Sequence, residues 1–188
     1  MKGCRPLTDN EVKEVSDKLL CLRDKALFIL GVRSGFRVSE LLSLKVSNVY
    51  QFKQIMERVQ VDRKNMKRKV ESRSVPIHED ARDALLALIT IERLEPSDHL
   101  FKSAKGENKP MSRIQAWRIL KAAYLLSQIG GKTGTHSMRK TFAAKVHKAV
   151  KGDIVKTQRA LGHKNLNSTA SYMSFADEEI DDAILGVA

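Results

Sequence analysis

The hydrophobic pattern of this chain is helical over most of its length, and it changes period in one region. Between about Met56 and Ile77 the pattern alternates: Val59 and Val61 are flanked by polar or charged residues, and a second extended stretch follows at Ser72–Ile77. Alternation with a period of two is typical of half-buried strands, whereas apolar residues three or four apart indicate amphipathic helices. We therefore expect a predominantly α fold with a small antiparallel β-sheet, which is the α+β class.

Helix start and stop signals divide the rest of the chain. Thr8 and Glu11 have the spacing of a capping box, so a first helix is expected to begin there. Stop signals and apolar spacing predict further helices at Arg23–Ser34 (ended by Gly35), at Val38–Leu44, around Ala84–Ile91, after a Ser112 cap, from His136 to about Val150, at Asp153–Leu161 (ended by Gly162) and at Asp177–Val187, with a further segment around Ser168–Phe175. The segment Val46–Gln54 is expected to be a connection. Because the sequence shows no repeat, low-complexity tract or linker, we expect one domain over residues 1–188.

The charge balance favours a partner that carries phosphates. The 188 residues include 34 Lys and Arg against 22 Asp and Glu, which gives a formal net charge of +12. Such a balance is suited to nucleic acid, although solvated lysine faces on other soluble proteins also produce it. Cys4 and Cys21 form neither a close metal-binding pair nor a disulfide framework, which favours a reducing compartment. The sequence has no signal peptide or membrane-length apolar run, so we expect a soluble, cytoplasmic protein.

The turn between the two predicted strands is strongly basic. Residues 63–69 include five lysines and arginines in seven positions, among them Lys64 and Lys67. Taken alone, such a segment is typical of a solvated hairpin tip.

The last third of the chain contains three short polar signals. His136 and Arg139 are three residues apart, so they lie on one face of the predicted helix and could address the same anion. His163 follows Leu161-Gly162 at a helix stop, and Tyr172 lies nine residues further on. Each signal is ordinary by itself: an exposed polar face, a capping histidine or a packed aromatic. Their combination in this order and spacing is not ordinary, and it points to one site.

Together with the earlier segment Gly35-Phe-Arg37-Val-Ser-Glu40-Leu-Leu, these motifs resemble the catalytic domain of the tyrosine recombinases, the phage integrase type. The resemblance extends from about Pro6 to Phe175. It implies a mainly helical domain with a small antiparallel sheet, and a catalytic lysine on the basic hairpin turn. Counting back from Arg73-Ser-Val-Pro76 favours Lys67 for that role, and Lys64 remains an alternative. The catalytic motifs begin within the first forty residues, so the family's amino-terminal DNA-binding domain is expected to be absent.

The chemistry that the resemblance implies assigns a role to each residue. Arg37 and Arg139 would hold the nonbridging oxygens of a phosphodiester through their planar forks of donors, and His163 would add a further donor. Tyr172 would attack the phosphorus, with His136 as proton acceptor because a tyrosine hydroxyl is a poor nucleophile at neutral pH.

Two further roles complete the predicted site. Lys67 would protonate the departing 5′ oxygen, and Glu40 would orient Arg37. Because the covalent bond to tyrosine conserves the energy of the diester, neither a cofactor nor a metal is expected.

The sequence thus predicts a site-specific recombinase or integrase that cleaves and rejoins DNA through a 3′-phosphotyrosine intermediate. Activity like that of a type IB topoisomerase would use the same residues. A non-catalytic DNA-binding accessory protein and a helical interaction domain are further alternatives. The expected partner is double-stranded DNA, with a monomer in isolation and a homotetramer on paired DNA sites.

Overall fold

The structure, a computed structural model, describes residues 3–61, 72–170, 172 and 185. The chain folds into two compact units, residues 2–142 and residues 143–188. The boundary falls within helix α6 (Thr135–Ala149). The expectation of a single domain over residues 1–188 therefore remains a prediction.

The first helix begins, and the second helix ends, at the residues that the sequence signals indicate. Helix α1 (Asp9–Lys18) opens on a capping box in which the Thr8 side chain accepts from the Glu11 N–H and the Glu11 side chain accepts from the Thr8 N–H. Helix α2 (Leu22–Ser34) ends at Gly35, which has a φ of 62° and donates its N–H to the Gly31 carbonyl. A left-handed residue at this position is the usual stop for a helix, and glycine adopts it without steric cost.

The segment after α2 is more structured than the expected connection. Helix α3 (Val38–Leu42) is followed by a 3₁₀ turn, η1 (Val46–Asn48), and a short hairpin of β1 (Tyr50–Gln51) and β2 (Gln54–Ile55). The hairpin turn consists of Phe52 and Lys53, both with positive φ. Two-residue turns of this geometry usually carry Asn-Gly or Asp-Gly, so the residues here contain no turn signal.

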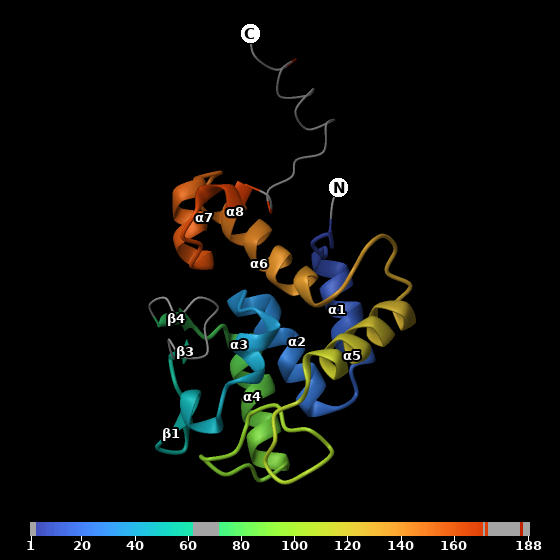
Figure 1. The fold of residues 1–188 in the computed structure, drawn as a ribbon, viewed down its shortest axis with the longest axis vertical. Coiled ribbons are helices and arrows are strands. Elements are labelled where there is room, and N and C mark those ends of the chain that lie inside the picture. Colours follow the sequence, from blue (N-terminus) through green and yellow to red (C-terminus); the bar gives the residue numbers. More distant parts are fainter. Residues whose placement is uncertain (1–2, 62–71, 171, 173–184, 186–188) are drawn as a thin grey trace. The chain divides into compact units, whose positions relative to one another are not determined.

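The predicted antiparallel strand pair is confirmed. Strand β3 (Arg58–Val61) pairs with β4 (Arg73–Pro76), with Val59 opposite Val75 and Val61 opposite Arg73. Side chains alternate between exposed and buried along both strands, as the period of two requires. In Figure 1 the two strands lie side by side.

Three longer helices complete the first unit. Helix α4 (Glu79–Ile91) begins after His78, and α5 (Arg113–Leu126) begins after Ser112, whose hydroxyl accepts from the Gln115 N–H as the predicted cap. Helix α2 packs against α4, and α5 packs against α1 and α3 (Figure 1). The beginning of α6 lies in this unit.

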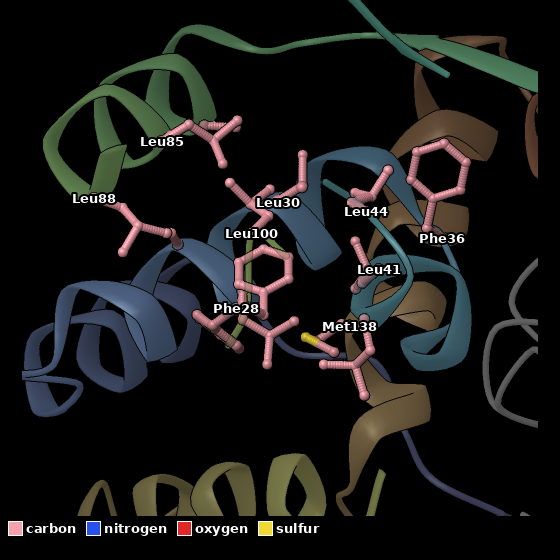
Figure 2. Close-up of a cluster of buried hydrophobic side chains, with 14 of the residues drawn as sticks. Phe28, Leu30, Phe36, Leu41, Leu44, Leu85, Leu88, Leu100 and Met138 are labelled. Carbon is pink, nitrogen blue, oxygen red and sulfur yellow. The ribbon is translucent and has the colours of Figure 1, made fainter. Parts of the chain in front are cut away.

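The apolar core of the first unit joins these elements. Figure 2 shows side chains from α2, α3, α4, α6 and the segments between them gathered into one cluster, including Phe28, Leu41, Leu85, Leu100 and Met138. All five are fully buried. Helix α2 contributes buried residues on several sides. Its last residue, Ser34, is buried too, so the helix ends inside the fold, at the turn that leads into α3.

The second unit contains the remaining helices. Helix α7 (Ile154–Leu161) is capped by the Asp153 side chain and ends at Gly162, which has a φ of 64°. It packs against the short helix α8 (Leu166–Ala170). The predicted acidic helix at 177–187 lies almost entirely outside the described residues. The fold class is confirmed as predominantly α with small antiparallel sheets, and no helix in the described part of the chain is long and apolar enough to span a membrane.

Candidate active site

Arg37 is held at the turn between α2 and α3. It is the N-cap residue of α3, its backbone N–H donates to Oε2 of Glu40, and its Nη1 donates to Oε1 of the same carboxylate, both at 2.8 Å. Glu40 is fully buried, whereas the Arg37 side chain is 27% exposed. The side-chain hydrogen bond directs the guanidinium group, and the backbone hydrogen bond holds the carboxylate at the turn.

Arg139 reaches the same turn from helix α6. It is 1% exposed, and its Nη1 donates to the carbonyl oxygen of Gly35 at 2.5 Å. Its neighbour Met138 packs in the core, so the helix cannot rotate without disrupting that packing. The structure therefore brings Arg37 and Arg139 to one turn. His136 is exposed at the start of the same helix.

The beginning of α6 is anchored on three sides. The Ser137 hydroxyl accepts from the Gly134 N–H, and the Tyr124 hydroxyl donates to the Gly134 carbonyl. One turn later, the Thr141 hydroxyl accepts from the backbone N–H of Leu7 at 2.8 Å. Because α6 presents both His136 and Arg139, these contacts set the position of the predicted histidine–arginine pair.

A third arginine, Arg73, lies at this turn, and the sequence reasoning did not assign it to the site. It is the first residue of β4 and is 8% exposed. Its Nη2 donates to the Ser34 carbonyl at 2.8 Å, and its Nη1 lies 3.4 Å from the Gly35 carbonyl. The strand pattern contained a signal, because Arg73 lies two residues before Val75 and so occupies the buried face. An arginine on an apolar strand face needs buried partners.

The ring systems next to the turn enclose this third guanidinium group. The Arg73 guanidinium lies 4.7 Å from the ring centre of Phe36 and 5.9 Å from that of Phe142. Both distances are within the range of cation–π attraction.

The charges at this turn act on one another. Burial, together with the positive charges of Arg139 and Arg37, lowers the pKa of Arg73 to about 9, and the carboxylate of Glu40 opposes the shift. Three guanidinium groups are therefore close enough to repel one another around one buried carboxylate. We name this set, Arg37, Glu40, Arg73 and Arg139, the arginine cluster. A cluster of this kind is suited to an anion with several oxygens.

The predicted hairpin lysine is not among these residues. Lys67 and its alternative Lys64 both lie outside the described residues. The strands on either side are described, and Val61 faces Arg73 in register. The choice between the two lysines therefore stays a prediction.

His163 and Tyr172 lie close together in the second unit. His163 follows the α7 stop at Gly162, and its Nδ1 lies 3.0 Å from the hydroxyl of the buried Thr169. Tyr172 donates its backbone N–H to the Thr169 carbonyl, and its ring centre lies 5.2 Å from that of His163, with the ring planes 66° apart. Thr169 thus links the predicted donor to the predicted nucleophile, and the sequence reasoning did not assign it.

Among the described residues, no group of three or more His, Cys, Asp or Glu side chains is arranged to hold a metal ion. The predicted site residues that the structure describes supply guanidinium groups and the His136 imidazole in the first unit, and the imidazole and phenol of His163 and Tyr172 in the second.

Comparison with known proteins identifies the family. The sequence profile of the phage integrase family matches residues 6–179, which is nearly the whole chain. The chain belongs to the phage integrase family. This confirms the resemblance to the tyrosine recombinases and, at the level of the family, the prediction of a tyrosine recombinase enzyme.

Individual relatives support the same membership. The chain is 33% identical over 173 residues to the probable integrase/recombinase YoeC of Bacillus subtilis, covering 89% of this chain and 87% of that protein. It is 32% identical over 176 residues to the tyrosine recombinase XerD of Pseudomonas aeruginosa, covering 90% of this chain and 55% of the relative. This integrase-family chain thus spans most of the first relative and about half of the second.

Solved structures show the same fold. The chain superimposes on the XerA recombinase with a TM-score of 0.78 at 24% identity, covering 97% of this chain and 63% of the other. It matches XerH bound to its difH substrate with a TM-score of 0.73 at 20% identity, covering 98% and 55%. A lambda integrase dimer bound to a core site gives a TM-score of 0.70 at 18% identity, covering 92% and 48%. These integrase-family structures confirm the predicted recombinase catalytic-domain fold.

Proposed function

We propose that this chain is a site-specific DNA recombinase that cleaves and rejoins DNA strands through a covalent 3′-phosphotyrosine intermediate. The observation that carries the proposal is the arginine cluster, in which Arg37 and Arg139 meet at the α2–α3 turn with Glu40 behind Arg37. Membership of the phage integrase family supports the same reading.

The arginine cluster is suited to a phosphodiester under attack. The phosphorus passes through a five-coordinate state whose nonbridging oxygens carry two negative charges, and planar guanidinium groups bind such oxygens in pairs. Arg37 is half-buried, so its guanidinium group can still meet a ligand from solvent. Because the donors are fixed before the ligand arrives, they stabilise developing charge without reorganisation.

Tyr172 and His163 would complete the reaction. The Tyr172 oxygen attacks the phosphorus and forms the phosphotyrosyl bond, its proton passes to His136, and the bond to the 5′ oxygen breaks. Lys67, or Lys64, gives a proton to that 5′ oxygen. His163 donates to a nonbridging oxygen. In rejoining, a 5′ hydroxyl from the original or a partner strand displaces the tyrosine. The bonds and protons balance without a cofactor or a metal.

Double-stranded DNA is the proposed partner. The net charge of +12 provides the electrostatic attraction to phosphates. The XerH and lambda integrase structures that this fold resembles are complexes with their DNA sites. We propose that the chain acts as one catalytic domain, is monomeric in isolation and forms a homotetramer on paired DNA sites.

Covalent capture tests the proposal. Duplexes with a randomised central sequence and a nick near the cleavage position lose the short 5′-hydroxyl fragment after cleavage, so the covalent intermediate accumulates. The protein is expected to form an adduct that survives SDS, and sequencing of the captured DNA gives the site. The substitution Tyr172→Phe should abolish the adduct.

The matched control is Tyr50→Phe, because Tyr50 is also half-buried but lies on strand β1, outside the arginine cluster and the second unit. This control should form the adduct at the wild-type level. Sequence-specific retention of DNA by the wild type with no adduct would instead support a DNA-binding accessory protein.

A further inference from the structure

The carbonyl groups of Ser34 and Gly35 are a shared acceptor for two arginines from different parts of the chain. Arg139 approaches from helix α6 and donates to the Gly35 carbonyl. Arg73 approaches from strand β4, donates to the Ser34 carbonyl at 2.8 Å and lies 3.4 Å from the Gly35 carbonyl. The next residues after these carbonyls are Phe36 and Arg37, so the turn that accepts from both arginines also presents the third.

We propose that Arg73 is a positioning residue of the active site: it fixes the Ser34–Gly35 turn and thereby sets the geometry of Arg37 and Arg139 toward the scissile phosphate. The inference rests on the proposed function. It adds a role to a residue outside the Arg37, Lys67, His136, Arg139, His163 and Tyr172 set.

The contacts of the Arg73 side chain indicate that it acts through its neighbours. Its side chain is 8% exposed, and its guanidinium lies near the rings of Phe36 at 4.7 Å and Phe142 at 5.9 Å. Two of its nitrogens, Nη1 and Nη2, are directed at main-chain carbonyls of the turn. Arg37, in contrast, is 27% exposed. A phosphate entering from solvent therefore meets Arg37 before it could meet Arg73.

Packing alone does not require an arginine at this position. A methionine has a similar length and would also contact the rings of Phe36 and Phe142. It would not bring a third positive charge to the site, where the charges of Arg139 and Arg37 disfavour the protonated form of Arg73. What methionine lacks is the fork of donors that reaches two successive carbonyls. These hydrogen bonds offset the repulsion between Arg73 and the other two arginines. They hold the Ser34–Gly35 turn in place.

The test compares Arg73→Met, Arg73→Lys and a matched control, Arg82→Lys. Arg82 is half-buried and, like Arg73, donates to a backbone carbonyl, that of Ile77 beside β4, but it lies outside the arginine cluster. Each variant is assayed for thermal unfolding, for DNA affinity and for the rate of adduct formation at saturating protein on the nicked substrate. If Arg73→Met does not fold, Arg73→Lys takes its place, because lysine keeps the positive charge and is expected to fold.

The expected result is a loss in rate without a loss in binding. Because a displacement of about 1 Å in a catalytic group can cost about a hundredfold in rate, Arg73→Met should form the adduct about a hundredfold more slowly. Arg73→Lys should lie between it and the wild type, and DNA affinity should stay within about threefold in both. Arg82→Lys should match the wild type. Rates close to wild type in both folded Arg73 variants would overturn the proposal.

Two further measurements exclude other roles. In an Arg139→Lys background, the additional effect of Arg73→Lys should shrink to about threefold or less, because both arginines act through the Gly35 carbonyl. Full additivity would contradict the proposal. On a substrate with sulfur in place of the 5′ bridging oxygen, whose thiolate leaves without protonation, Arg73→Met should show the same loss. Recovery on that substrate would mean that Arg73 acts on the leaving group.

The outcomes also separate this inference from the proposed function. If the wild type forms no Tyr172-dependent adduct, the recombinase proposal itself is wrong. If the wild type and both Arg73 variants form it equally fast, the recombinase proposal stands and the role of Arg73 is refuted.

Discussion

Replacing Gly35 by alanine should damage both the fold and the site, for reasons that can be separated. Gly35 has a φ of 62°, a left-handed conformation that alanine adopts only with strain. A Cβ at this position would lie 2.7 Å from Cγ of the Phe142 ring, and closer still to Cδ1. The ring is rigid and cannot move aside as the end of a long, flexible side chain would. The same residue carries the carbonyl that accepts from Arg139 and Arg73.

The expected loss of stability follows from these contacts. Left-handed strain costs about 1–2 kcal/mol, and overpacking against a ring costs about 1–3 kcal/mol. Alanine also lowers the conformational entropy of the unfolded chain, which stabilises the folded state by about 0.4–1 kcal/mol. The net loss of unfolding free energy is therefore about 3 kcal/mol, and for a chain of this length it lowers the melting temperature by about 6–12 °C.

Urea unfolding of Gly35→Ala measures this loss, with Gly31→Ala as control. Gly31 lies inside α2 with ordinary helical φ, and its added Cβ would lie 2.6 Å from Sδ of the buried Met138 and 3.3 Å from Cδ1 of the buried Leu41. This control shares the overpacking but not the left-handed strain, and alanine is the better helix former, so its loss of unfolding free energy should be smaller than that of Gly35→Ala. Adding Phe142→Ala to Gly35→Ala should recover the steric part of the loss and leave the strain. A Gly35→Ala protein as stable as the wild type would refute the reasoning.

Three further predictions concern single contacts. Thr169→Val removes the hydroxyl 3.0 Å from Nδ1 of His163 and should slow adduct formation by up to about a hundredfold. Thr169→Ser keeps a hydroxyl and should form the adduct at close to the wild-type rate. Equal rates for the two variants would show that the hydroxyl does not position His163. Glu40→Gln should lower the free energy of unfolding by about 1–3 kcal/mol in urea titrations, because it leaves a weaker buried partner for Arg37; an unchanged midpoint would contradict this. Arg5 and the Thr8 cap lower the pKa of Glu11, so the ionised carboxylate stabilises the fold at neutral pH and this contribution disappears as the pH falls through that lowered pKa. Glu11→Gln should therefore be less stable than the wild type at neutral pH, and the difference should shrink as the pH falls through that lowered pKa; a difference that does not change with pH would show that the charge is not responsible.

Local signals in the sequence were sufficient for several helix boundaries, whereas α4 begins at Glu79, before the expected Ala84. The Thr8 cap, the Gly35 stop and the Gly162 stop each act within one turn of the chain, and the structure confirms all three. The β1–β2 hairpin was missed because Phe52 and Lys53 adopt positive φ without the residues that usually mark such a turn. That turn is held by its surroundings, which a local pattern does not contain.

The candidate site was predictable where a motif placed its residues close together in sequence. Arg37 with Glu40, and His136 with Arg139, lie within one helical turn of each other. Arg73 was missed because its partners, the carbonyls of Ser34 and Gly35, lie almost forty residues earlier. The tertiary fold brings them together, and no spacing rule in the sequence indicates a hydrogen bond to a main-chain carbonyl.

Thr169 illustrates a second limit. Its hydroxyl and its carbonyl act on His163 and Tyr172, six residues before and three residues after it. A threonine in a short helix is commonplace, and nothing in its type distinguishes a positioning hydroxyl from a solvated one. The geometry supplies that distinction.

The most direct test of the central claim is to identify the atom that carries the DNA. After nuclease treatment of the trapped adduct and digestion with trypsin, the carboxyl-terminal peptide from Asn165 onward contains a single tyrosine, Tyr172. Fragmentation in the mass spectrometer should place a 3′-linked nucleotide on that residue. A nucleotide on any other side chain, or an unmodified peptide from a protein that has cleaved DNA, would contradict the account.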